Sequence, residues 1–178
     1  MKRQYIITLA AALIAAPASY GQFAATGTTT LSVTVSAEAA LSVTTSTTTL
    51  AAIGTIFNPY TGTTNLTYKI RTTQSTGTGS VTLKVTSDFS PAGGPSVTTP
   101  PTAGHALSYT CTAAAPATAC SGSQTSSTSA STSVATFGAG ASSANAGSSA
   151  STVWSLTNDP TYKTGSYSAT VTYTISAT

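Results

Sequence analysis

Apolar and hydroxyl-bearing residues alternate along several stretches of this chain, and the last stretch has the clearest pattern. From Tyr167 to Ser176 the odd positions are apolar or aromatic, and the even positions are all serine or threonine. Successive side chains of a β-strand point to opposite faces, so the pattern predicts a strand with one buried face and one face in water. We expect this strand to complete a β-sheet.

The longest alternating stretch covers residues 31–43, where only Ala40 interrupts the polar positions. At about 3.3 Å per residue such a strand would extend roughly 40 Å, which is longer than most strands of a compact domain. Two interpretations stay open. The strand could bend and serve both sheets of a sandwich, or its front half could reach beyond its own domain.

Shorter strands are predicted between these two stretches. Residues 66–71 and 81–86 alternate on either side of a glycine-rich turn and predict a β-hairpin. Residues 89–101 are rich in proline and glycine, which predicts a surface loop. Residues 121–151 are nearly all small, with Val134 and Phe137 as the main apolar anchors, and predict weakly specified strands and loops.

No amphipathic helical pattern follows the first 21 residues. About eight short strands therefore predict an all-β protein with a single antiparallel β-sandwich of immunoglobulin-like build. We expect this domain to cover residues 31–178.

The chain begins with the pattern of a secretory signal peptide, which we assign to residues 1–21. Lys2 and Arg3 precede an apolar run from Ile6 to Ala16, and Pro17 and small residues follow it. That run is shorter than the roughly 20 residues of a membrane-spanning helix, so we expect no transmembrane segment. The mature protein is predicted to be secreted and associated with the cell surface, with residues 22–30 as a flexible leader.

Charged residues make up only 5% of the chain. Removal of the signal peptide leaves four basic and three acidic side chains, a net charge of +1. Such a balance does not favour binding to nucleic acid. A surface with so few charges also does little to keep sheet edges apart, which suits a subunit that assembles outside the cell.

Cys111 and Cys120 are the only cysteines, and in an exported chain they predict a disulfide. A free redox pair is the alternative. We expect no metal site, because two thiolates and a single histidine, His105, do not make a closed zinc site.

Catalytic chemistry has few candidate residues. The acids are Glu38, in the polar phase of a predicted strand, and Asp88 and Asp159, in turn positions. His105 lies in a loop rich in proline and glycine, and no serine lies in a nucleophile-elbow motif. We expect no enzymatic activity and no cofactor.

Three basic residues, Lys69, Arg71 and Lys84, share the outward phase of the predicted hairpin. They could bind an anionic glycan or wall polymer. The alternative is a charged exterior that prevents edge-to-edge pairing.

The C-terminal residues resemble the WxL family of cell-surface domains. Trp154-Ser155-Leu156 has the WxL form, and residues 167–175 resemble the second element of that family, with Tyr173 in place of its second tryptophan and Ile175 in place of its leucine. The resemblance implies a β-rich module that binds peptidoglycan non-covalently, with Trp154 in the binding site. The alternative role for Trp154 is a core aromatic packed between two sheets.

The general organisation resembles secreted fimbrial and spore-coat-U-like subunits. The shared features are a signal peptide, an alternating N-terminal segment, a small sandwich, a disulfide and a closing strand that begins at Gly165 and Tyr167. In fimbrial families the N-terminal segment completes the sheet of a neighbouring subunit. The resemblance implies that the donated side chains are Leu31, Val33, Val35, Ala37 and Ala39.

We therefore expect a secreted, non-enzymatic structural subunit of a bacterial surface filament, coat or adhesive layer. Its partners would be further copies of itself or other surface subunits, joined through β-strand pairing. The alternative is a WxL-like domain that binds cell-wall glycan. A third possibility is an isolated secreted domain that does not assemble.

Overall fold

A computed structural model describes residues 26–54 and 56–178 of the chain. The predicted signal peptide, residues 1–21, lies outside the described residues, as do residues 22–25 of the predicted leader. The chain divides after Thr34 into two units, and the second, Val35–Thr178, is the folded domain. Residues 26–34 have no regular secondary structure.

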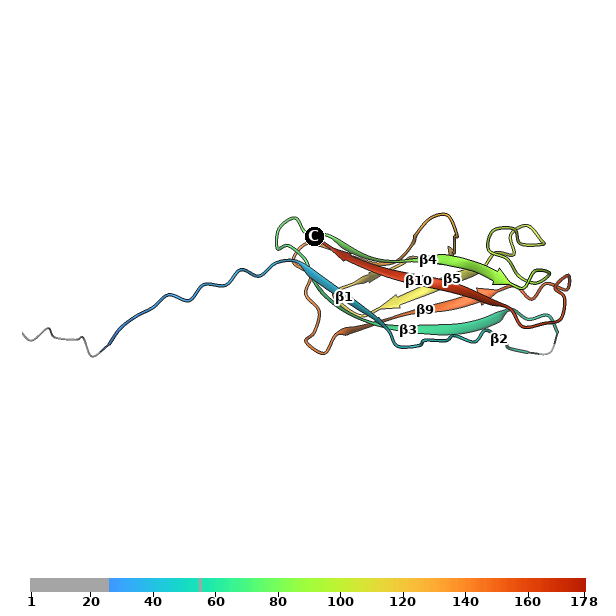
Figure 1. The fold of residues 1–178 in the computed structure, drawn as a ribbon, viewed down its shortest axis with the longest axis horizontal. Helices are drawn as coiled ribbons and strands as arrows, with labels where there is room; N and C mark the ends of the chain where they lie inside the picture. The colour runs from blue at the N-terminus through green and yellow to red at the C-terminus, as the bar shows by residue number, and fades with distance from the viewer. Residues whose placement is uncertain (1–25, 55) are drawn as a thin grey trace, which may run out of the picture. The chain divides into compact units, whose positions relative to one another are not determined.

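The domain consists of β-strands joined by loops, and the described residues contain no helix (Figure 1). Accordingly, no described segment is a helix of the length and apolarity that a membrane crossing requires. The strands are β1 (Glu38–Val43), β2 (Ala51–Ala52), β3 (Tyr60–Arg71), β4 (Gly79–Ser90), β5 (Ser108–Ala113), β6 (Thr118–Ala119), β7 (Gln124–Thr125), β8 (Thr132–Phe137), β9 (Ser148–Leu156) and β10 (Ser168–Ala177).

Two antiparallel sheets form a sandwich, which confirms the predicted fold class. The first sheet has the order β1-β3-β9-β5-β7, and β2 also pairs with β3. The second has the order β10-β4-β8-β6. The closing strand predicted over residues 167–176 is confirmed as β10, at the edge of the second sheet.

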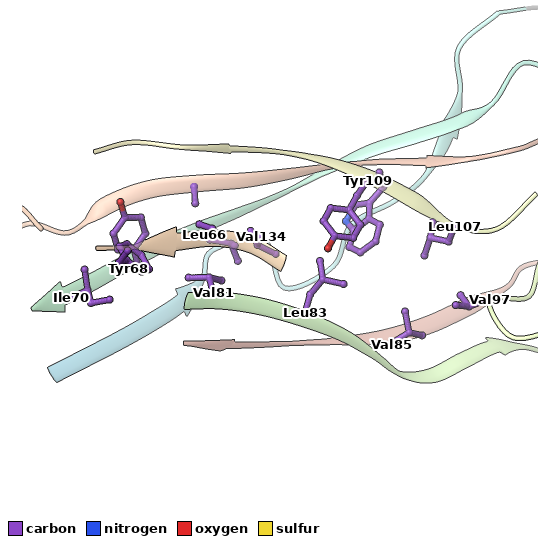
Figure 2. Close-up of a cluster of buried hydrophobic side chains, with 14 of the residues drawn as sticks. Leu66, Tyr68, Ile70, Val81, Leu83, Val85, Val97, Leu107, Tyr109 and Val134 are labelled. Atoms are coloured by element: carbon purple, nitrogen blue, oxygen red, sulfur yellow. The ribbon is translucent and has the colours of Figure 1, made fainter. Parts of the chain in front are cut away.

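Alternating side chains from both sheets build the core. Leu66, Tyr68 and Ile70 of β3 face inward from the first sheet, and the apolar residues of β4 face them from the second. Figure 2 shows these side chains between the two sheets, together with Val134 of β8. Val134 and Phe137, the two anchors of the low-complexity stretch, are both buried. The alternation of apolar and polar residues therefore predicted correctly which side chains face the core.

The disulfide closes one long side of the sandwich. Cys111 lies in β5 of the first sheet and Cys120 directly follows β6 of the second, with 5.5 Å between their Cα atoms. This confirms the predicted Cys111–Cys120 pair. At the opposite side, the edge strands β1 and β10 belong to different sheets and have no backbone pairing to each other.

The predicted hairpin between residues 66–71 and 81–86 is wrong. These residues lie in β3 and β4, which belong to different sheets. Both strands have an inward apolar face, and alternation does not tell whether two strands share a sheet or face one another across the core. Residues 72–78 connect the two sheets.

The long first strand is shorter than its sequence pattern. Only Glu38–Val43 forms a strand, and Ala39 and Leu41 pair there with Ile70 and Tyr68 of β3. Residues 31–37 make no strand pairing. The alternation continues through both parts, but only the second part has a neighbouring strand to pair with.

Candidate functional site: an apolar groove beside β10

A groove of about 1150 Å³ opens between the two sheets on the side without the disulfide. One wall is the first part of β10, from Ser168 to Val171 and Tyr173, and the other is the segment from Val43 to Leu50. Trp154 and Leu156 of β9 form part of its floor.

The groove exists because β10 has a neighbour on one side only. It pairs with β4, and its other edge faces the groove. Its inward side chains, Ala169, Val171, Tyr173 and Ile175, are only half-buried. The corresponding residues of β9, a central strand, are fully buried. The inward face of β10 thus lacks the apolar cover that a further strand would give.

A chain of hydroxyl groups crosses the floor between the sheets. The Tyr173 hydroxyl and the Thr152 hydroxyl lie 2.6 Å apart. Next to them, the Trp154 indole N–H donates to Thr64 Oγ1 at 2.9 Å, and Thr64 Oγ1 lies 2.6 Å from Thr48 Oγ1. These bonds satisfy the polar atoms of an otherwise apolar floor and tie β10 to the first sheet.

Gly62 of β3 lets the second wall lie close to the sheet. A Cβ atom at this position would lie 2.6 Å from the Thr49 carbonyl oxygen and 2.9 Å from a methyl carbon of Leu50. Any larger side chain would push residues 48–50 away from β3. The absence of a side chain at Gly62 therefore sets the shape of this wall.

β1 closes one end of the groove. β1 pairs with residues 66–71 of β3, so it covers the half of the sandwich that lies beyond Thr64. Thr64 is opposite Thr152, which bonds to Tyr173, so β1 lies next to β10 beyond Tyr173. Figure 1 shows β1 beginning at the same end of the domain as the C-terminus. β1 does not cover the other end, where β10 begins, and we call this the open end of the groove.

The groove wall carries two charged residues, Asp159 and Lys163. Hydrogen bonds from Thr102, from the Thr161 backbone and hydroxyl and from His105 outweigh burial and hold the pKa of Asp159 below its ordinary value. His105 Nδ1 lies 2.9 Å from Asp159 Oδ2. The sequence gives no sign of this pair, because 54 positions separate the two residues.

The His105–Asp159 pair joins two loops. Within the described part of the chain, the other imidazole nitrogen, Nε2, makes no hydrogen bond, so the pair has no hydroxyl partner of the kind a catalytic triad needs. Residues 26–54 and 56–178 also contain no cluster of three His, Cys, Asp or Glu side chains that could hold a metal ion.

The predicted donor residues lie in two different environments. Leu31, Val33 and Val35 have no strand partner, and their side chains are 91%, 86% and 62% exposed. Ala37 is half-buried, and Ala39 belongs to β1 of its own domain. Three alternating apolar side chains therefore precede the first strand without any apolar cover.

The predicted wall-binding residues do not form one surface. The Trp154 side chain is buried, with 4% exposure, and packs at 5.3 Å between ring centroids against Tyr109. Lys69 and Arg71 lie on β3, and Arg71 pairs with Glu38 at 3.2 Å. Lys84 lies on β4, in the other sheet. The basic strip depended on the predicted hairpin, so it is absent.

An apolar groove beside a free strand edge can bind an extended peptide. Backbone groups of β10 would pair with the peptide backbone, and every second peptide side chain would enter the groove. Comparison with protein families, with curated proteins and with solved structures finds no match for this chain.

Proposed function

We propose that this protein is a secreted, non-enzymatic structural subunit of a bacterial surface filament, coat or adhesive layer. Subunits assemble when the N-terminal segment of one copy, with Leu31, Val33 and Val35, adds a strand to β10 of another. The observation that carries this proposal is the apolar groove along the free edge of β10.

The groove and the N-terminal segment have matching patterns. Inward residues of β10 recur at every second position from Ala169 to Tyr173, and the apolar residues of the segment recur at every second position from Leu31 to Val35. Both runs cover five residues, about 17 Å of extended chain. One added strand would therefore cover the exposed apolar side chains of both partners.

The free edge also supplies backbone pairing. Unpaired N–H and C=O groups of an edge strand readily pair with another chain, and natural proteins usually protect such edges with charges. From Ser168 to Ala177, β10 has no charged residue. A segment that is mostly threonine, serine and apolar side chains can approach this edge without electrostatic repulsion.

The test is assembly of the mature protein with Val33→Asp and Val35→Asp together. Two carboxylates in the groove would be buried without partners, which costs several kcal/mol, so we expect the variant to stay monomeric in size-exclusion chromatography. Its circular dichroism spectrum should remain that of the folded wild type, because residues 26–37 make no strand pairing in their own chain.

The matched control is Ser32→Asp with Thr34→Asp. This variant has the same added charge in the same segment, but its carboxylates would point away from the groove, so we expect it to assemble like the wild type. Equal assembly of both variants would refute strand donation. Unfolding of the Val33 and Val35 variant would mean that the segment completes its own domain instead.

A further inference from the structure

An exposed apolar loop lies at the open end of the groove. Ile53, Ile56 and Phe57 follow β2, and their side chains are 73%, 77% and 59% exposed. Phe57 has φ 46°, a backbone conformation that residues other than glycine rarely adopt. Three large apolar side chains exposed together on a domain with few charges indicate a contact surface.

The apolar loop and the donor segment lie at opposite ends of the domain. The loop with Ile53 lies at the end where β3 and β10 begin, because Ala52 pairs with Tyr60. The donor segment leaves the domain at the opposite end, where β1 begins opposite Arg71. Arg71 Nε donates to the Ser36 carbonyl at 2.8 Å and fixes the point of departure there. Figure 1 shows β1 and β2 at these two ends.

The open end of the groove decides the direction of a donated strand. Because β1 lies next to β10 beyond Tyr173, a donor enters from the end where β10 begins, and the body of the donor subunit stays at that end. Residue 35 is nearest that body, so it lies beside Ala169, and residue 31 lies deeper, beside Tyr173. The donated strand therefore runs antiparallel to β10.

This direction makes the contact between subunits heterologous. The end of the donor subunit where β1 begins meets the end of the acceptor where β10 begins, so the donor keeps its groove free and the acceptor keeps its segment free. Such a contact generates an open polymer, whereas a parallel strand would join two like ends into a closed dimer.

We propose that consecutive subunits join head to tail and that Ile53, Ile56 and Phe57 form a second contact, against the β1-starting end of the donor subunit. The proposal rests on the proposed function. Ile56 and Phe57 also line the groove, so the loop continues the same apolar surface outward, to where the body of the donor must lie. The occupant of this surface is a second copy of the chain.

The first test separates the loop from the groove. Ile53 does not line the groove. We therefore expect Ile53→Ser to leave the binding of a synthetic peptide of residues 26–37 unchanged. This binding is measured on the Val33→Asp, Val35→Asp variant, which does not assemble. In the otherwise wild-type chain, Ile53→Ser should raise the protein concentration at which polymers form about tenfold. This factor corresponds to a loss of roughly 1.4 kcal/mol from the free energy of association. Val153→Ser, an exposed valine on the outer face of β9, is the control and should polymerise normally.

The second test reports strand direction. In the antiparallel arrangement residue 34 is opposite residue 170, and in a parallel one of the same depth it is opposite residue 172. We expect Thr34→Cys with Thr170→Cys to give a ladder of disulfide-linked oligomers on non-reducing gels, and Thr34→Cys with Thr172→Cys to give none.

The outcomes distinguish the two proposals. Failure of the peptide to bind would refute the proposed function itself. Peptide binding together with normal polymers from Ile53→Ser, or with covalent dimers from the Thr172 pair, would overturn the head-to-tail contact and leave strand donation intact.

Discussion

The hydroxyl groups of Tyr173 and Thr152 lie 2.6 Å apart and connect the two sheets across the floor of the groove. Tyr173 belongs to an edge strand of the second sheet, and Thr152 to a central strand of the first. The disulfide connects the sheets on the far side of the sandwich. On the open side this hydrogen bond helps to hold β10 at its distance from β9.

Tyr173→Phe tests this role. The substitution keeps the ring and leaves the buried Thr152 hydroxyl without this partner, so we expect the free energy of unfolding to fall by about 1–2 kcal/mol in urea denaturation. Tyr167→Phe is the control, since its hydroxyl donates to the Lys163 carbonyl at an exposed position. An unchanged unfolding midpoint for Tyr173→Phe would show that the bond adds nothing.

Removal of the disulfide should lower the free energy of unfolding by more than Tyr173→Phe does. Cys111 and Cys120 close a loop with a sequence separation of 9, and the chain-entropy model gives about 2.5–3 kcal/mol for a loop of this size. We expect Cys111→Ala with Cys120→Ala to lower the free energy of unfolding by that amount. Addition of a reductant should lower the stability of the wild type similarly and leave the double variant unaffected, which is the internal control.

Protonation of Asp88 should lower the stability of the domain in acid. Burial by itself would raise the pKa of Asp88, but hydrogen bonds from the backbone N–H groups of Val97, Thr98 and Phe89 and from the Ser96 hydroxyl lower it to about 2. The unfolded chain takes up this proton near pH 4 and the folded chain near pH 2. The stabilisation is therefore complete above pH 4 and is lost as the pH falls to 2.

Asp88→Asn should reveal this contribution in urea melts at several pH values. We expect lower stability than wild type at pH 7 and a smaller loss between pH 4 and pH 2. Glu38→Gln is the control, because its carboxylate forms an exposed ion pair with Arg71 and such pairs contribute about 0–1 kcal/mol. If Asp88→Asn loses as much stability between pH 4 and pH 2 as the wild type does, Asp88 is not the cause of that loss.

Trp154 tests the wall-binding alternative. The side chain is buried and its N–H donates to Thr64, so Trp154→Ala should destabilise the domain by about 3–5 kcal/mol and lose any binding through unfolding. Trp154→Phe preserves most of the packing and is the informative variant. We expect Trp154→Phe and the wild type to sediment with isolated peptidoglycan to the same extent. If this variant loses binding while its circular dichroism spectrum stays native, the WxL-like function is favoured.

The sequence by itself determined the features that depend on neighbouring residues along the chain. Alternation identified β10 and the inward faces of β3 and β4, because the two-residue period of a strand is a local property. The pairing of Cys111 with Cys120 followed from their being the only two cysteines in an exported chain. The pattern over residues 31–43 was also visible as longer than most strands of a compact domain, but it left open whether the strand bends within the domain or reaches beyond it.

Tertiary structure alone decided which strands are neighbours. Alternation gives the buried face of a strand, but its edges pair through backbone groups that are identical in every residue, so the pattern could not tell that β3 and β4 lie in different sheets. It also could not tell that β10 has a free edge, that Ala39 pairs within its own domain, or that His105 meets Asp159. The groove exists because a strand neighbour is absent beside β10, and the absence of a neighbour leaves no mark on the residues of that strand.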